Sequence, residues 1–238
     1  MPPEEDDVAR ALSGEGDRQA LAALARAMSA SARAAGAGAV ATGRWAAEWL
    51  VDNAPRIPVR DLATLQAHHG GRQGAALAAE LVRAASRTSA AFGAAAGGLV
   101  AVHELAPPAW LAIPFELVAE TVAVAAVELK LVAELHEAYG RPVTGSRGDR
   151  SLALLQAWAE RRGVSPTTLA HPGGLSEALG RGARDQAVRL VRRRLAGRLG
   201  RNLSALAPLL AGAVAGAELN RRATKALGEA VMGDLSSP

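Results

Sequence analysis

Residues 110–140, WLAIPFELVAETVAVAAVELKLVAELHEAYG, decide the fold of this chain. Ala, Leu, Val and Glu fill the stretch without a sustained strand-like alternation, and most of these residues favour helix. A terminal Gly, followed two residues later by Pro, gives the order that commonly ends a helix. We therefore predict one long helix that begins near Trp110 or Pro114 and ends at Tyr139.

The residues before this helix predict a second apolar helix that packs against it. A helical pattern runs from Arg72 through an uncharged stretch at 88–102 and stops near Pro107 and Pro108, because adjacent prolines cannot continue a helix. The two helices should form an antiparallel hairpin, which is the most apolar part of the chain.

The remaining sequence also predicts helices. Ile is rare and aromatic residues make up only 3% of the chain, so a β-sheet would lack its usual residues. We expect an all-α protein, a single helical bundle with the apolar hairpin at its centre, over residues 17–235. The acidic residues 1–16 should form a flexible N-terminus. Further helices are predicted at 17–34, 40–52, 61–69, 150–161, 165–170, 175–200 or 181–200, 203–217 and 218–235.

Two pairs of glycines occur at a spacing of four residues, Gly93 with Gly97 and Gly212 with Gly216. Each pair lies in an uncharged run of 15 or 16 residues, which is shorter than the roughly 20 residues of a membrane span. We expect the two patterns to pack on each other, because small residues allow helix backbones to approach closely. Insertion into a bilayer leaflet and an oligomer contact are the alternatives.

Charge is distributed in blocks along the chain. Residues 1–30 carry 3 basic and 6 acidic groups, residues 103–140 carry 1 and 6, and residues 141–201 carry 13 and 4. The blocks either attract each other within the fold or mark an anionic partner. The chain has no Cys, which excludes a disulfide framework, a thiolate metal site and a cysteine nucleophile.

The basic block contains a predicted amphipathic helix at 184–200, in which arginines flank and oppose a narrow apolar stripe. This helix has three interpretations: it docks on the bundle, lies on anionic lipid, or binds nucleic-acid phosphates. We expect no nucleic-acid partner, because stacking aromatic residues and recognised motifs are missing. The arginines that would contact an anionic surface are Arg189, Arg192, Arg193, Arg194 and Arg198.

One carboxylate of the 110–140 helix falls among apolar residues. Glu128 lies on the side expected to be buried, and His136 also falls on the apolar arc. Because a buried carboxylate must be paired or protonated, these two residues form the candidate buried polar site. An ion pair with the Arg-rich region is the structural interpretation, and a catalytic acid is the alternative. The other charged residues should form a stripe toward solvent or an interface: Glu116, Glu120, Lys130 and Glu134.

Motifs of known catalytic and cofactor sites are missing from the sequence. The histidines form no His-Glu-x-x-His or Glu-x-x-His pattern, so we expect no metal. Phosphate-binding loops and the Gly-x-Ser-x-Gly nucleophile motif are also missing. We therefore assign no catalytic or cofactor-binding residue and expect no cofactor. The histidines considered are His68, His69, His103, His136 and His171.

The order of features resembles a known family. The helix end ELHEAYG at 134–140 follows the apolar hairpin, and an Arg-rich helix precedes AGAVAGAELNRRATKALGEA at 211–230. This arrangement resembles the EcsC protein family over about residues 72–235. Since that family has no established activity, the resemblance implies only a helical, membrane-associated accessory protein. By resemblance, the positions of interest are Tyr139, Gly140, Asn220, Thr224 and Gly228.

Together, these patterns favour a non-enzymatic accessory protein that binds an anionic membrane surface or a membrane protein complex. The basic amphipathic helix and the apolar hairpin would make the contact. The N-terminus lacks the basic start and apolar core of a secretory signal, so we expect a cytoplasmic protein, peripheral at the inner face of the membrane. The alternatives are a soluble helical enzyme or a carrier of a lipid-like ligand, with a site in the core near Glu128 and His136.

Overall fold

Helices make up most of the part of the chain that the structure describes, which confirms the all-α prediction. This computed structural model describes residues 12, 18–41, 44–103, 113–161 and 209–237, and none of them forms a strand. The elements in chain order are α2 (Arg18–Ala35), α3 (Ala37–Ala41), α4 (Arg44–Asn53), the 3-10 turn η1 (Ala54–Arg56), α5 (Leu62–His68), α6 (Gly74–His103), α7 (Ile113–Ala138), α8 (Arg147–Arg161) and α10 (Leu209–Ser236).

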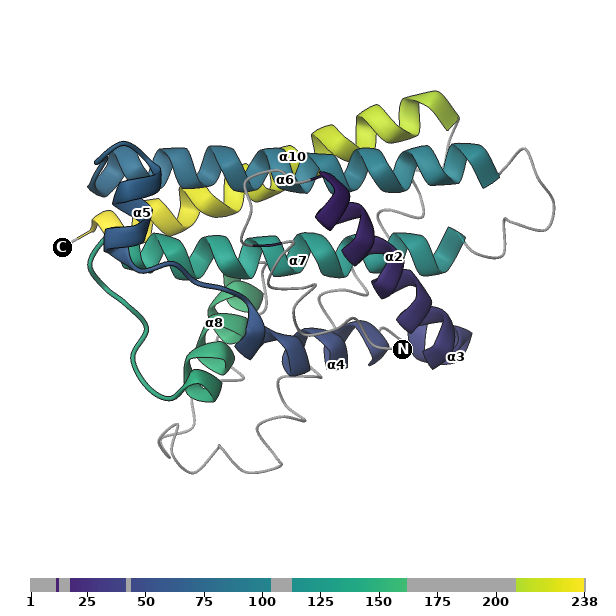
Figure 1. Cartoon of the computed structure of the whole chain (residues 1–238), viewed down its shortest axis with the longest axis horizontal. Helices are drawn as coiled ribbons and strands as arrows, with labels where there is room; N and C mark the ends of the chain where they lie inside the picture. The colour runs from purple at the N-terminus through teal and green to yellow at the C-terminus, as the bar shows by residue number, and fades with distance from the viewer. Residues whose placement is uncertain (1–11, 13–17, 42–43, 104–112, 162–208, 238) are drawn as a thin grey trace.

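Three long helices, α6, α7 and α10, pack along one another and form the framework of the bundle (Figure 1). α6 and α7 run antiparallel, as the hairpin prediction requires, and α10 packs along both of them (Figure 1). Gly93 lies against Gly216 while Val82 lies against Gly228, so α10 is antiparallel to α6. The turn of the hairpin, at 104–112, lies outside the described residues.

α7 is the central helix of this arrangement. It contacts α2, α3, α4, α5 and α8 in addition to α6 and α10. From Val118 to Leu135, every side chain except that of Lys130 is buried. Two acids of the predicted charged stripe, Glu120 and Glu134, are buried, so they lie at contacts with other elements and not toward solvent.

Two helix boundaries differ from the sequence predictions. The sequence predicts separate helices at 203–217 and 218–235, whereas α10 is continuous from Leu209 to Ser236. Gly216 does not interrupt it, because a single Gly is tolerated inside a helix and here allows a close approach to α6. The helix predicted at 40–52 is instead divided between α3 and α4.

The predicted flexible N-terminus contains one residue that packs in the core. Leu12 is helical and only 5% exposed, as expected for an apolar side chain that gains stability from burial. The rest of residues 1–16 lies outside the described residues, as do the helices predicted at 165–170 and 181–200.

Candidate functional site

Glu128 on α7 is fully buried, as the sequence predicted, with 0% of its surface exposed. Its two carboxylate oxygens contact different helices. The indole N–H of Trp158 on α8 donates to Oε2 over 3.0 Å, and the hydroxyl of Thr224 on α10 donates to Oε1 over 3.0 Å. Glu128 therefore joins three helices. The ion pair expected with the Arg-rich region is not tested, because residues 162–208 lie outside the described part of the chain.

The polar contact extends from Glu128 into α6. Thr224 Oγ1 is 2.9 Å from Ser89 Oγ, and both residues are completely buried. Each of these buried polar groups would cost about 1–3 kcal/mol if its partner were removed. The chain of contacts from Ser89 through Thr224 and Glu128 to Trp158 thus fixes α6, α7, α8 and α10 in one register.

A second buried polar contact lies farther along the same helices. The side-chain amide of Asn220 on α10 donates to Glu120 Oε1 on α7 over 2.6 Å. Asn220 also lies beside the close crossing of α6 and α10, because a Cβ added to Gly93 would meet its Nδ2 at 2.8 Å. The predicted packing of the two small-residue patterns is confirmed here for Gly93 and Gly216.

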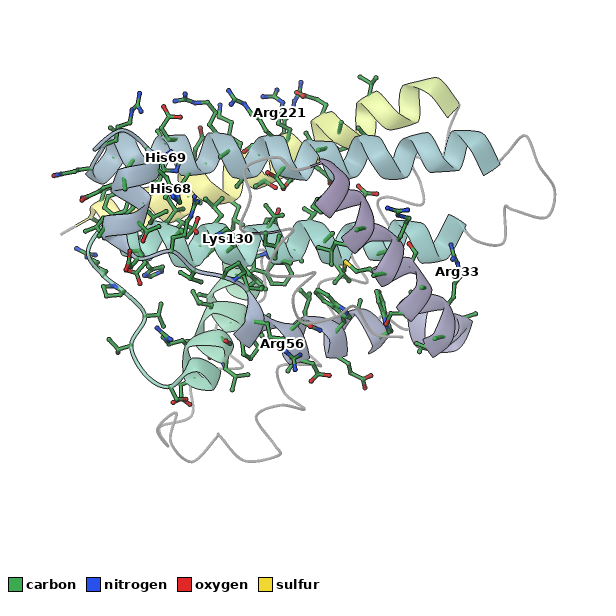
Figure 2. All side chains as sticks on the ribbon, in the orientation of Figure 1. Arg33, Arg56, His68, His69, Lys130 and Arg221 are labelled. Atoms are coloured by element: carbon green, nitrogen blue, oxygen red, sulfur yellow. The ribbon has the colours of Figure 1, made fainter. Side chains whose placement is uncertain are left out.

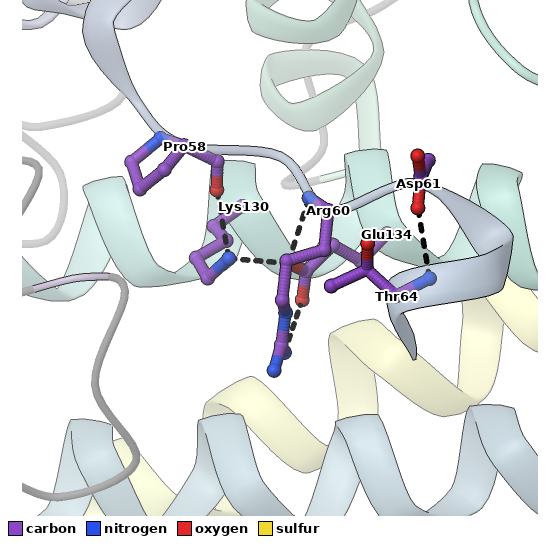
Figure 3. Close-up of polar contacts among 6 residues, drawn as sticks. All are labelled: Pro58, Arg60, Asp61, Thr64, Lys130 and Glu134. Atoms are coloured by element: carbon purple, nitrogen blue, oxygen red, sulfur yellow. Dashed lines mark hydrogen bonds and ion pairs between the residues drawn. The ribbon is translucent and has the colours of Figure 1, made fainter. Parts of the chain in front are cut away.

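A charged cluster joins α7 to the extended segment between η1 and α5 (Figure 3). Glu134 is 3% exposed and accepts two parallel hydrogen bonds from Arg60, with Nε and Nη2 each at 2.9 Å. Lys130 also donates to Glu134, and it donates to the carbonyl of Pro58 over 2.7 Å. Charge-assisted, bidentate contacts of this kind are among the stronger hydrogen bonds in proteins. The cluster holds residues 58–60 against the central helix.

Burial and neighbouring charges shift the pKa values of Glu134 and Lys130 in opposite directions. Burial raises the pKa of Glu134, but the hydrogen bonds from Arg60 and the positive charges of Lys130 and Arg60 outweigh it, so the pKa lies below the ordinary value of 4.5. Burial lowers the pKa of Lys130 below 10.5, although Glu134 opposes the shift. Glu134 is therefore held as a carboxylate in the folded protein.

His136 does not join Glu128. It lies in the last turn of α7, eight residues and about 12 Å along the helix axis from Glu128, and it is only half-buried. Its Nδ1 is 3.2 Å from the carbonyl oxygen of Arg141, just beyond the Gly140 turn, where φ is +66°. The two-residue polar site predicted from the sequence is therefore not assembled, and His136 contacts the loop that follows α7.

The positions singled out by resemblance have structural contacts. Asn220 and Thr224 are buried in polar contacts with α7. Gly228 faces α6 and α7, because an added Cβ would lie 2.5 Å from Val82 Cγ2 and 3.3 Å from Leu131 Cδ2. Gly140 ends α7, and Tyr139 packs against the core. These positions hold the helices together.

A surface pocket of about 380 Å³ opens at another place, between the segment 54–61, the C-terminal end of α7 and the first turns of α8. Its polar lining includes Asp61, Glu137 and Arg150, together with apolar side chains such as Leu154. Sequence reasoning did not identify it, because the segment 54–61 is far in the chain from the lining residues at 133–154 and they share no motif.

The acidic groups of this pocket differ in their electrostatics. Hydrogen bonds from Thr64, including one from its backbone N–H at 2.8 Å, lower the pKa of Asp61, which caps α5. Burial raises the pKa of Glu137, and the negative charge of Asp61 raises it further, whereas the positive charge of Arg150 lowers it. The ionised form of Glu137 is thus disfavoured in the pocket, and a cationic partner would stabilise it.

The arginines predicted to contact an anionic surface, Arg189, Arg192, Arg193, Arg194 and Arg198, lie outside the described residues. In the described part of the chain, basic side chains also project outward, as Figure 2 shows for Arg221 on α10.

None of the helices in the described ranges combines the length and hydropathy required to cross a membrane. Within the same ranges, no three His, Asp or Glu side chains are arranged to hold a metal ion.

The comparisons with known proteins found no relative of this chain. No protein-family model, curated protein or solved structure matches it. Its function must therefore follow from the contacts and charges described above.

Proposed function

We propose that the protein is a non-enzymatic accessory protein that binds an anionic surface, that of a membrane or of a membrane-bound complex, through residues 184–201. The observation that supports this proposal is the role of Glu128. This carboxylate is the strongest candidate for a catalytic acid, yet it is enclosed and used in contacts that join α8 and α10 to α7. The helical bundle then serves as a scaffold for a binding surface.

Charge gives the proposed surface its chemistry. Residues 141–201 carry 13 basic and 4 acidic groups, whereas residues 103–140 carry 1 and 6. Three acids of α7 have partners inside the bundle: Glu134 is bound by Arg60, Glu120 by Asn220, and Glu128 by Trp158 and Thr224. Those acids are therefore not available to neutralise the basic block. The resemblance to the EcsC family stays a prediction and favours the same role.

Liposome co-sedimentation tests this proposal. The purified protein should sediment with vesicles that contain anionic lipid and stay in solution with neutral vesicles. Each basic residue near such a surface contributes about 1 kcal/mol, so changing Arg192, Arg193 and Arg194 to Gln should weaken binding by about two orders of magnitude.

A second triple variant supplies the control. Arg83, Arg87 and Arg222 are exposed on α6 and α10, so their change to Gln removes the same charge from described helices. This control variant should bind anionic vesicles more strongly than the variant altered at 192–194. Absence of binding to any vesicle, or equal losses in the two variants, would contradict the proposal.

A further inference from the structure

The pocket beside α8 brings an acid and a base together without joining them. Glu137 on α7 and Arg150 on α8 both line it, and they are close enough for Arg150 to lower the pKa of Glu137. Among the described residues, however, neither side chain forms an ion pair or a side-chain hydrogen bond. Within the described ranges, each therefore offers hydrogen-bonding groups to a ligand in the pocket.

The surroundings of these two charges limit what fits between them. Asp61 adds negative charge on the Glu137 side, while its own carboxylate is engaged with Thr64. Pro58 and Leu154 contribute apolar surface. The volume of about 380 Å³ lies at the small end of the range of about 300–1,000 Å³ that is typical of ligand pockets. A complementary molecule is small and partly apolar, with a positive and a negative end.

We infer that this pocket binds a free α-amino acid with an apolar side chain, whose ammonium group contacts Glu137 and whose carboxylate contacts Arg150. Arginine suits the carboxylate because its guanidinium offers two parallel N–H donors. The carboxylate of Glu137 and the negative field of Asp61 suit the ammonium. The apolar side chain packs on Leu154 and Pro58. This site is independent of the proposed binding surface at 184–201.

The pocket is anchored to rigid parts of the fold. The segment that forms one wall is held to α7 by the contacts of Arg60 and Lys130 with Glu134 (Figure 3). α8, which carries Arg150, is held to α7, which carries Glu137, by the hydrogen bond from Trp158 to Glu128. The buried polar contacts thus fix the elements that carry the two charges relative to one another, as a specific binding site requires.

Isothermal titration calorimetry on the full chain tests the inference, with L-leucine, L-valine and L-phenylalanine as probes. At least one of them should bind saturably. Isocaproate lacks the ammonium group of leucine, and isoamylamine lacks its carboxylate, so each should bind about tenfold or more weakly than leucine. No binding of the three amino acids at millimolar concentration would overturn the inference, as would binding of both analogues with the same affinity as leucine.

Two variants test the residues themselves. Glu137→Gln and Arg150→Gln should each weaken amino-acid binding by about tenfold or more, because each removes one charged contact. The matched controls, Glu229→Gln on α10 and Arg87→Gln on α6, alter exposed residues that do not line the pocket and should bind as the unaltered protein does. Unchanged affinity in both pocket variants, with melting temperatures preserved, would overturn the assignment.

Discussion

Gly93 on α6 lies directly against the backbone of Gly216 on α10. A Cβ atom at Gly93 would come within 2.8 Å of both the carbonyl carbon and the carbonyl oxygen of Gly216, and within 2.8 Å of Asn220 Nδ2. These distances are too short for any side chain at this position. The crossing of the two helices therefore depends on the absence of a side chain at Gly93.

Replacing Gly93 with Ala should destabilise the protein. Ala favours helix over Gly by about 1 kcal/mol, but the new methyl group meets backbone atoms that cannot move aside. We expect a net loss of about 1–3 kcal/mol in the free energy of unfolding, measured by denaturant titration. Gly233→Ala is the control, because nothing lies within 4 Å of its added Cβ, and it should be neutral or stabilising. Equal stability of the two variants would contradict the close crossing.

Gly228→Ala should also destabilise the bundle. Here the added methyl group meets the side chain of Val82, which can itself be shortened by mutation. The added methyl would lie 2.5 Å from Val82 Cγ2. Because Val is stiff at χ1, we expect a loss of about 1–3 kcal/mol. In a Val82→Ala background the same change should cost clearly less, which a double-mutant cycle on thermal unfolding would measure. Strict additivity of the two changes would rule out the contact.

Glu128→Gln should destabilise the protein without any effect on charge at the surface. The Gln amide can accept at only one of its two positions, so it cannot accept from both Trp158 and Thr224 as the carboxylate does. We expect a loss of about 1–3 kcal/mol, observed as a lower melting temperature. The control is Glu229→Gln, which alters an exposed carboxylate on α10. An unchanged melting temperature for Glu128→Gln would show that the carboxylate does not hold these helices.

The Glu134 cluster should make stability fall in acid. Because the pKa of Glu134 is lowered below 4.5 in the folded protein, its stabilising contribution is complete above the unfolded-state pKa and is lost as pH falls through the folded-state pKa. Glu134→Gln should lower stability at neutral pH by about 3 kcal/mol, because it leaves Arg60 and Lys130 without their carboxylate partner.

Urea denaturation between neutral pH and about pH 3 would reveal this dependence. The unaltered protein should lose more stability over this range than the Glu134→Gln variant does. Parallel curves for the two proteins would mean that Glu134 titrates alike in the folded and unfolded chains.

Helix positions follow closely from local sequence signals. The cap at Asp61 and the glycine and proline after Tyr139 act within a few residues, so the predicted bounds of α5 and the predicted end of α7 agree with the structure. The predicted end of α6 near Pro107 and Pro108 lies outside the described residues. The burial of Glu128 could also be predicted, because the phase of a regular helix places it among apolar neighbours.

The partners of these residues could not be predicted in the same way. Trp158 is 30 residues from Glu128 and Thr224 is 96 residues away, and no local pattern specifies which helices meet. The helical phase also left open whether Glu134 faces solvent or another part of the protein. A polar stripe on one helix is the same whether it meets water or, as here, Arg60 of a distant segment. The helical phase likewise does not specify the contact of His136, whose Nδ1 lies near the carbonyl oxygen of Arg141 beyond the end of α7.

The salt dependence of vesicle binding tests the proposed surface most directly. The Debye length shortens from about 30 Å at 0.01 M salt to about 8 Å at 0.15 M, so binding through the arginines of 184–201 should weaken steeply over that range. We predict a steep decrease for the unaltered protein and a much shallower one for the variant with Arg192, Arg193 and Arg194 changed to Gln. Binding that is independent of salt in both proteins would contradict an electrostatic surface contact and would point to insertion of apolar residues instead.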